Sequence, residues 1–317
     1  MRQVIMIDAV VIGRNEGVRL VACLESLKGR VRRIIYVDSG STDGSVATAG
    51  TLGAEIVELD RTLPFTAARA RNTGLKLLGE DSEFVQLVDG DCAIRDGWID
   101  AAREYLMAHP RTAVVCGRRR ERYPDTSLYN ALIDAEWDTP VGAAKACGGD
   151  ALMRMSALRE VGFYRDDLIA GEEPELCVRL RHAGWNIWRL DEEMTWHDAN
   201  ITRFGQWWRR TRRAGFAFAE GAALHGAPPE RHWVKETRRA LAWGLVLPAL
   251  IFLGAMITPA MLVLLMIYPA QVLRLSRRSG LVPAVFSVIG KFAEGWGVLE
   301  YGLTRLRGKN SGIIEYK

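Results

Sequence analysis

Two aspartates, Asp89 and Asp91, are the residues whose type and spacing most directly indicate chemistry in this sequence. They follow an apolar run at residues 84–88 that is typical of a buried β-strand, so at least one carboxylate is expected at the end of that strand. Hard carboxylate oxygens suit Mg²⁺ or Mn²⁺, ions that usually keep water and bridge to substrate phosphates. An isolated D-x-D is more often a polar turn, but its place after a strand, with Asp38 ending an earlier one, favours a metal site.

The elements that must position these residues alternate between strand and helix, which predicts an α/β fold. Strands are expected at residues 4–12, 34–37, 54–59, 84–88, 113–116 and 186–190. Such alternation favours a mainly parallel sheet covered by helices on both faces. Ligands bind beyond the carboxyl ends of the strands in these sheets, so the polar clusters at 14–16, 38–43 and 89–91 are expected to converge on one cleft.

Composition excludes several classes of protein. With 317 residues, 49% hydrophobic and 25% charged, the chain is globular rather than disordered or collagenous. The five cysteines include no C-x-x-C pair for zinc or redox chemistry, which indicates a reducing compartment. The first residues do not resemble a secretory signal, so the catalytic part is expected in the cytoplasm.

The C-terminal part predicts membrane attachment. Residues 240–273 contain no charge and are flanked by arginines on both sides, which favours a hairpin turning near Thr258-Pro259 with both ends in the cytoplasm; the alternative is one tilted span. The mixed pattern of 282–306 resembles an amphipathic helix at the membrane surface. We therefore expect a catalytic domain at 1–220, with halves 1–117 and 118–220, a basic connector at 221–239, the membrane segment at 240–273 and an interfacial tail at 274–317.

Four ordered segments resemble family 2 glycosyltransferases of the GT-A type. They are VVIGRNE at 10–16, VDSGSTDGS at 37–45, ARNTG at 70–74 and DGD at 89–91. The resemblance covers roughly the first 220 residues, and four motifs in order are far more specific than one. It implies a GT-A fold and inverting, metal-dependent hexosyl transfer from a nucleotide-diphosphate sugar, as in membrane-associated enzymes of bacterial polysaccharide, exopolysaccharide or glycolipid biosynthesis.

The same resemblance assigns the donor side. Asp91 would be the main metal ligand and Asp89 would lie nearer the ribose or sugar. Asp38 would take the base or ribose, while Arg71 and Asn72 would face the diphosphate or donor sugar. The other positions that would border the nucleotide are Val11, Ile12, Arg14, Glu16, Ser41 and Asp43.

One-step inversion requires a base that takes the proton of the acceptor hydroxyl. The family carries this carboxylate at the end of a Glu-Asp pair that opens a helix, and Glu173 takes the place of the aspartate here. Glutamate is one methylene longer, so Glu172 competes for the role. Acids before Pro174 also suit the first turn of a helix, which leaves a purely structural capping function as the alternative.

Further site residues are expected on the acceptor and diphosphate side. Gly149 permits close approach of a sugar, and Asp150 either binds hydroxyls or stabilises a turn. His197 sits where many relatives bring a histidine to the metal or diphosphate. One segment partly matches the Q-x-x-R-W motif of polysaccharide synthases. This segment either closes over the acceptor and diphosphate or anchors the chain at lipid headgroups, and its residues are Gln206, Trp207, Arg209 and Arg210.

The basic run at 118–122 follows the strand expected to end at Cys116. Such a run is usually a solvated face, and the functional alternative is contact with an anionic acceptor or the leaving phosphate. Nucleic-acid binding is not expected, because stacking aromatics and a known binding module are lacking.

Together these features predict a glycosyltransferase at the cytoplasmic face of the cytoplasmic membrane. Its donor would be a UDP- or GDP-sugar, its acceptor a lipid-linked or polysaccharide hydroxyl, and its cofactor Mg²⁺ or Mn²⁺. The alternatives are a sugar-phosphate nucleotidyltransferase, or a non-catalytic membrane-bound protein that binds carbohydrate or nucleotide.

Overall fold

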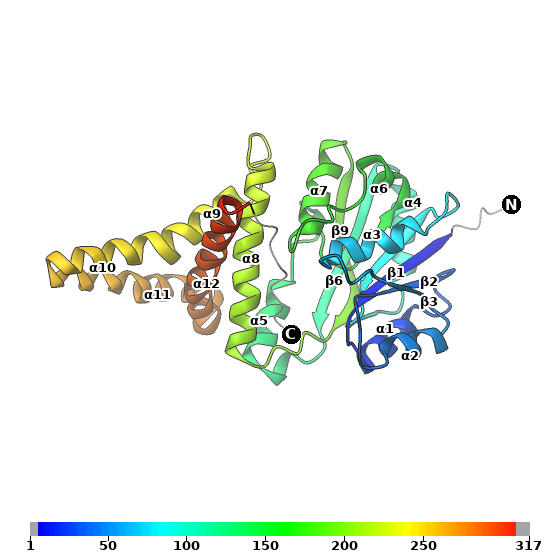
Figure 1. Ribbon diagram of the computed structural model, residues 1–317, viewed down its shortest axis with the longest axis horizontal. Coiled ribbons are helices and arrows are strands. Elements are labelled where there is room, and N and C mark those ends of the chain that lie inside the picture. The colour runs from blue at the N-terminus through cyan, green and yellow to red at the C-terminus, as the bar shows by residue number, and fades with distance from the viewer. Residues whose placement is uncertain (1–5, 309–317) are drawn as a thin grey trace. The chain divides into compact units, whose positions relative to one another are not determined.

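The computed structural model describes residues 6–308 and divides into two compact units, Met1–Thr202 and Arg203–Lys317 (Figure 1). The division falls at Thr202 rather than near residue 220. The reason is that helix α8 (Phe204–His225) packs along α12 (Leu281–Leu306) and so belongs to the second unit. The first two residues of the strand expected at 4–12 lie outside the described range.

The first unit is built on a nine-stranded mixed sheet in the order β3-β2-β1-β4-β8-β6-β9-β5, with β7 paired to β9. Six strands run in one direction, but β8 is antiparallel to both β4 and β6 and separates two parallel groups. The sheet is therefore mixed, and most of its strands run parallel, as expected. The strands are β1 Ile7–Gly13, β2 Ile34–Asp38, β3 Glu55–Glu58, β4 Phe84–Asp89, β5 Cys92–Ile94, β6 Thr112–Glu121, β7 Gly142–Ala143, β8 Ala151–Arg154 and β9 Asn186–His197.

Helices flank this sheet (Figure 1), and strands β1, β2 and β4 are buried along almost their whole length. Burial on both faces explains why these strands are continuous apolar runs rather than alternating ones. The helix α3 begins after Thr66, whose side chain accepts a hydrogen bond from the Arg69 backbone amide. The helices are α1 Val18–Leu27, α2 Ser45–Thr51, α3 Ala67–Lys76, α4 Trp98–Ala108, α5 Leu128–Glu136, α6 Met155–Val161 and α7 Glu172–His182.

The strand register brings the polar clusters to one edge of the sheet. Gly13 of β1 pairs with Asp38 of β2, and Ile12 pairs with Asp89 of β4. On the other side of β8, the parallel strands β6 and β9 end in register at Glu121 and His197. The carboxyl ends of both parallel groups therefore carry acidic or imidazole side chains.

The second unit is helical. After α8 come α9 Val234–Leu241, a short π-helical stretch, α10 Leu247–Ile257, a 3₁₀ segment Pro259–Met266, α11 Ile267–Ser279 and α12. The part expected as a basic connector thus forms the end of α8 and most of α9. The chain reverses after Ile257, and the Tyr268 hydroxyl donates to the Trp243 carbonyl at 2.8 Å, so the uncharged segment is a helical hairpin.

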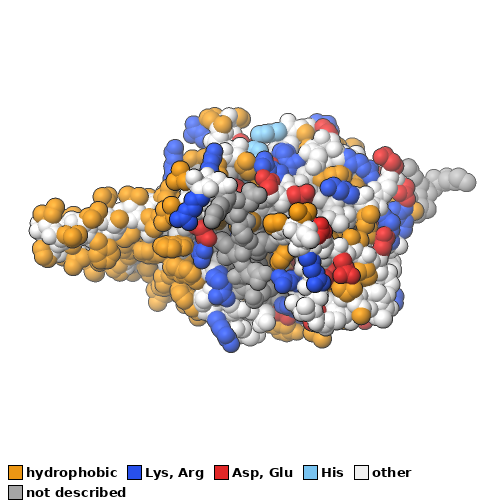
Figure 2. Space-filling model, in the orientation of Figure 1, with side chains coloured by type: hydrophobic (Ala, Val, Ile, Leu, Met, Phe, Trp, Pro, Cys, Tyr) orange, Lys and Arg blue, Asp and Glu red, His pale blue; other side chains and the backbone are white. Residues whose placement is uncertain are grey.

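Hydrophobic side chains cover the face of this hairpin seen in Figure 2. Three stretches of the described chain are long and apolar enough to cross a membrane: Val234–Ile257, Pro259–Ser279 and Leu281–Leu306. These helices indicate membrane association. They include α12, which the sequence pattern placed at the membrane surface.

Candidate active site

Arg71 of α3 joins three carboxylates that are far apart in the sequence. Its Nη1 lies 2.8 Å from Glu173 Oε1 and 3.0 Å from Glu172 Oε1, and its Nη2 lies 2.8 Å from Asp89 Oδ1. The arginine side chain is 3% exposed, so these contacts are shielded from water. The structure thus brings the first acid of the D-x-D and both candidate bases onto one guanidinium group.

A second arginine, Arg119 of β6, lies on the other side of Asp89. Its Nη2 is 2.8 Å from Asp150 Oδ2 and 3.4 Å from Asp89 Oδ2. Asp150 is fully buried, and it accepts hydrogen bonds from the Asp89 amide at 3.0 Å and from the Thr195 hydroxyl at 2.9 Å. These contacts favour a stabilising function for Asp150, because its carboxylate fixes the backbone of Asp89 at the end of β4.

Gly149 lies directly against the same ion pairs. A Cβ at this position would be 2.6 Å from Arg71 Nη2 and 2.6 Å from Asp89 Oδ2, closer than real Cβ contacts. Only glycine fits while the Arg71–Asp89 pair is kept. The space that glycine leaves at this position is thus used by the ion pair, and close approach of a sugar to Gly149 stays a prediction.

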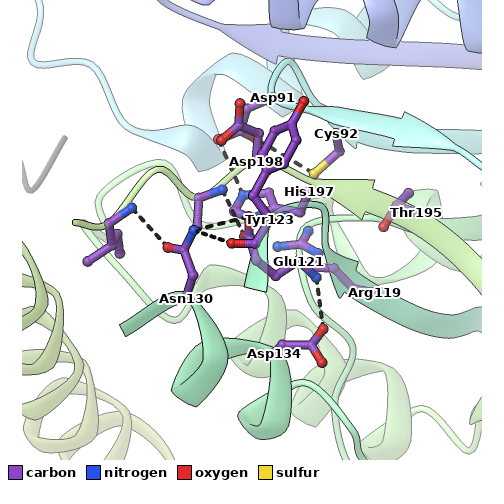
Figure 3. Close-up of polar contacts among 12 residues, drawn as sticks. Asp91, Cys92, Arg119, Glu121, Tyr123, Asn130, Asp134, Thr195, His197 and Asp198 are labelled. Atoms are coloured by element: carbon purple, nitrogen blue, oxygen red, sulfur yellow. Dashed lines mark hydrogen bonds and ion pairs between the residues drawn. The ribbon is translucent and has the colours of Figure 1, made fainter. Parts of the chain in front are cut away.

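Asp91 lies beside His197 (Figure 3), with 3.3 Å between Asp91 Oδ2 and His197 Nε2. Strand β5 positions the pair, because Cys92 is in register with His197 on β9. Burial raises the pKa of the Cys92 thiol, which donates to Asp91 Oδ1 at 3.6 Å. Burial also lowers the pKa of His197, so its imidazole is neutral near pH 7.

The donor set at Asp91 and His197 fits Mn²⁺ or Mg²⁺. It consists of one carboxylate oxygen and one neutral imidazole nitrogen, with Cys92 Sγ within 4.8 Å of both. Cys92 is a protonated thiol there, so a thiolate site of the kind used for structural zinc does not match. Two protein ligands leave positions for water and substrate phosphate, which is how Mg²⁺ is usually held.

Glu173 and Glu172 begin α7, directly after Gly171, which has a positive φ of 80°. Burial raises the pKa of Glu173 to about 7; the neighbouring Glu172 carboxylate adds to the increase and Arg71 opposes it. A carboxylate with this pKa is suited to accept a proton near neutral pH. The next acid on the helix, Glu175, is instead held by Arg179 at 2.7 Å.

Asn72 neighbours Arg71 but points to the segment that precedes α7. Its Nδ2 donates to the Tyr164 carbonyl at 2.8 Å and to Asp166 Oδ1 at 2.7 Å, and its Oδ1 accepts from the Tyr164 amide at 3.0 Å. These bonds fix α3 to that segment. Contact of Asn72 with a diphosphate stays a prediction.

The loops after β1 and β2 form a hydrogen-bonded pair. Both carboxylate oxygens of Asp38 accept hydrogen bonds. One accepts from the Tyr36 hydroxyl at 2.9 Å and the Ser41 hydroxyl at 2.5 Å, and the other accepts from the Gly40 and Ser41 amides at 2.7 Å. Asn15 then connects this turn to the first loop, because its Oδ1 accepts from the Thr42 amide at 2.7 Å.

The remaining donor-side residues lie around these two loops. Arg14 is exposed with its guanidinium 5.0 Å from the Phe65 ring, and Glu16 pairs with Arg19 at 2.7 Å. Asp43 is bound to Ser45, which lowers its pKa. Val11 and Ile12 are buried in β1. Contacts of these residues with a nucleotide stay predictions.

The residues of the Q-x-x-R-W-like segment lie in the first turns of α8, in the second unit. The Gln206 side chain accepts from the Arg203 amide at 3.0 Å, and the buried Trp207 ring packs edge-on against Phe286 at 4.9 Å. These are contacts that stabilise the helical unit. A role of Gln206, Trp207, Arg209 or Arg210 toward the acceptor or diphosphate stays a prediction.

Sequence reasoning missed the position of Arg119. Strand β6 continues to Glu121, so the basic run does not follow a strand but forms its second half. Arg118 is nearly buried and pairs with Asp134 at 2.9 Å, while Arg119 reaches Asp150 and Asp89. The expectation of a solvated face is wrong for these two arginines. The signal that could have revealed them is the continuity of the apolar run 113–116 with residues 117–121.

Residues 8–162 match the sequence model of the family described as Glycosyl transferase family 2. They contain the loops after β1 and β2 together with Arg71, Asp89, Asp91 and Gly149. The chain carries a family 2 glycosyltransferase domain. The matched range ends before α7, so Glu173 and His197 lie outside it. The folded structure brings these two residues to the site.

Curated relatives and solved structures agree with this assignment. The chain is 29% identical over 243 residues to a pre-mycofactocin glycosyltransferase of Mycobacterium tuberculosis, covering 69% of this chain and 48% of that protein. It is 26% identical over 194 residues to the succinoglycan biosynthesis protein ExoA of Rhizobium meliloti, covering 56% and 58%. The alignments thus span about half the length of these relatives.

Two solved structures share the fold. The mannosyltransferase PcManGT from Pyrobaculum calidifontis, in complex with GDP-Man and Mn²⁺, has a TM-score of 0.67 at 19% identity, covering 93% of this chain and 86% of that one. S. aureus TarS 1-349 has a TM-score of 0.53 at 14% identity, covering 96% and 92%. The fold is therefore of the GT-A type, as expected.

Proposed function

We propose that this protein is an inverting glycosyltransferase that moves a hexose from a UDP- or GDP-sugar to a hydroxyl of a lipid-linked or polysaccharide acceptor. The observation that carries the proposal is the contact of Arg71 with Glu173 at 2.8 Å and with Asp89 at 2.8 Å. The support is that Arg71 contacts both Glu173, a carboxylate with a pKa of about 7, and Asp89, the first acid of the D-x-D in the family domain.

In the proposed reaction, Glu173 accepts the proton of the acceptor hydroxyl. The acceptor oxygen forms the new bond to the anomeric carbon, and the bond from that carbon to the diphosphate oxygen breaks on the opposite face, releasing the nucleoside diphosphate. Arg71 orients Glu173, while Asp91 and His197 would hold Mn²⁺ or Mg²⁺. The ion, when bound, neutralises charge on the departing diphosphate, typically a large contribution to catalysis.

The acceptor is proposed to be reached at the cytoplasmic face of a membrane. Support comes from the three apolar helices and from the arginines that flank the hairpin at Arg238, Arg239, Arg274, Arg277 and Arg278. Positive charge on both sides of a hairpin favours a cytoplasmic position for both of its ends. The relation to ExoA makes an exopolysaccharide intermediate one candidate acceptor.

The donor is tested by thermal unfolding of the full chain in detergent with UDP-, GDP- and dTDP-sugars, each with and without Mn²⁺. A ligand at 100 times its Kd stabilises a protein by about 2.7 kcal/mol. We expect one nucleotide to raise the unfolding temperature, and to do so more strongly with Mn²⁺. The absence of any such increase would contradict donor binding.

The chemistry is tested with Glu173→Gln and Asp91→Asn, using the donor found in that screen. Loss of a general base typically reduces the rate by about 10²–10⁴-fold, and we expect a loss of this size for Glu173→Gln with donor binding retained. Asp91→Asn is expected to weaken the Mn²⁺-dependent part of donor binding as well. Glu160→Gln is the control, because it removes the charge of an exposed carboxylate whose hydrogen-bond donor is the Trp185 indole N–H. Near-normal transfer by both folded variants would refute the assignment.

A further inference from the structure

His197 lies between two carboxylates. Its Nε2 is 3.3 Å from Asp91 Oδ2, and its Nδ1 is 3.8 Å from Glu121 Oε2 (Figure 3). Nδ1 is buried and makes no hydrogen bond among the described residues. The Trp137 ring meets the imidazole edge-on, with the centroids 4.7 Å apart. The ring is thus enclosed, and the acidic groups face its two different nitrogens.

Glu121 is fixed by its surroundings. Its side chain is fully buried, and Oε1 accepts hydrogen bonds from the Tyr123 amide at 3.1 Å and from Asn130 Nδ2 at 3.3 Å. Oε2 accepts from the Ala199 amide at 3.0 Å. Ala199 follows His197 by two residues, so this hydrogen bond holds the Glu121 carboxylate close to the end of β9, where His197 lies.

These bonds leave Glu121 with one acceptor position unused. A carboxylate can accept about four hydrogen bonds, and three are made by the donors just described. The nearest candidate for the fourth is a proton on His197 Nδ1, which needs an approach of about 1 Å to reach hydrogen-bond distance. A proton there leaves the lone pair on Nε2, the nitrogen that faces Asp91.

We propose that Glu121 is a positioning residue that holds the proton of His197 on Nδ1 and thereby presents Nε2 to the divalent ion at Asp91. Metal-binding histidines commonly donate their second N–H to a carboxylate, and loss of that partner typically weakens metal binding by about 10–100-fold. The inference rests on the metal site of the proposed function and adds a residue outside the D-x-D.

The first test is a titration of the full-length protein in detergent with Mn²⁺ alone, followed by electron paramagnetic resonance. We expect Glu121→Gln to weaken Mn²⁺ binding about 10–100-fold. The control is Asp134→Asn. Asp134 accepts hydrogen bonds from the Glu121 amide at 2.8 Å and from Arg118 at 2.9 Å, and within the described chain it makes no hydrogen bond or ion pair with His197. The control is expected to bind Mn²⁺ within twofold of wild type.

The second test determines the tautomer of His197 directly, by NMR of histidine-labelled protein with Mg²⁺. The signal of His197 is identified as the one that is lost in His197→Gln. We expect wild type to carry the proton on Nδ1 and Glu121→Gln to lose this preference. A role limited to fold stability would leave the tautomer unchanged. If Glu121→Gln does not fold, the wild-type spectrum decides, and a proton on Nε2 overturns the proposal.

The outcomes separate the two levels of inference. No Mn²⁺ binding by wild type would refute the metal site of the proposed function. Binding by wild type with equal affinity in Glu121→Gln, or an equal loss in Asp134→Asn, would overturn the role of Glu121 alone.

Discussion

Arg71 and Arg119 together contact four carboxylates, those of Asp89, Asp150, Glu172 and Glu173. The local charge is therefore negative in a nearly dry environment, where like charges interact strongly. Two consequences follow. A divalent cation is favoured nearby, and one carboxylate, Glu173, is held with a raised pKa of about 7.

This pKa predicts how transfer depends on pH. Glu173 must be deprotonated to accept a proton, so kcat/KM is expected to rise about tenfold per pH unit below pH 7 and to level off above it. In Glu172→Gln the neighbouring negative charge is absent, which lowers the pKa of Glu173, so the rise is expected at lower pH. A flat profile between pH 5.5 and 8 in wild type would contradict Glu173 as the base.

At the scale of elements, glycines allow α8 and α12 to touch through their backbones. A Cβ on Gly297 would lie 2.0 Å from the Arg212 carbonyl oxygen and 2.6 Å from the Phe216 amide nitrogen. The same helix pair is joined by Arg212 and Glu300, with two contacts of 2.7 Å. Close backbone contact and a bidentate ion pair thus define one interface within the helical unit.

The interface predicts opposite results for two identical substitutions on α12. Gly297→Ala should force the helices apart and destabilise the protein by about 1–3 kcal/mol. Gly302→Ala meets open space and should be neutral or stabilising by up to about 1 kcal/mol, since alanine favours the helix. Thermal unfolding in detergent measures both. Equal unfolding temperatures for the two variants would show that the close contact contributes nothing.

For the whole molecule, the exposed apolar hairpin indicates membrane association. Met256 and Ile257, at its turn, are 83% and 87% exposed, which is costly in water and favourable in a bilayer. The hairpin is therefore consistent with the membrane-linked acceptor that we propose.

Charge at the turn should disrupt membrane binding. Charged side chains oppose insertion of an apolar segment, with a cost for arginine of up to roughly 2.5–3.5 kcal/mol on insertion scales, so Met256→Arg combined with Ile257→Arg should reduce co-flotation with lipid vesicles. Leu306→Arg is the control, because Leu306 is 85% exposed but lies beside Arg305 and Arg307. Undiminished flotation of the double variant, or an equal loss in the control, would argue against insertion of the turn.

Local sequence patterns identified most of the elements that carry the site. The strands expected at 34–37 and 84–88 occur where the apolar runs placed them, as β2 and β4. Such runs are informative because a strand buried on both faces needs apolar residues throughout. The antiparallel strand β8 was not predicted, since four residues carry no periodic signal strong enough to give a direction.

The family, the GT-A fold class and the apolar hairpin segment could be predicted from the amino-acid sequence, because local motifs, hydrophobic runs and charge gaps each lie within one stretch of chain. The folded chain was needed to show that Arg71 bridges Asp89 to Glu172 and Glu173, that Arg119 turns inward, and that Glu121 lies beside His197. These contacts join residues separated by many strands and helices, and their distances follow from sheet order and register, which no local pattern contains.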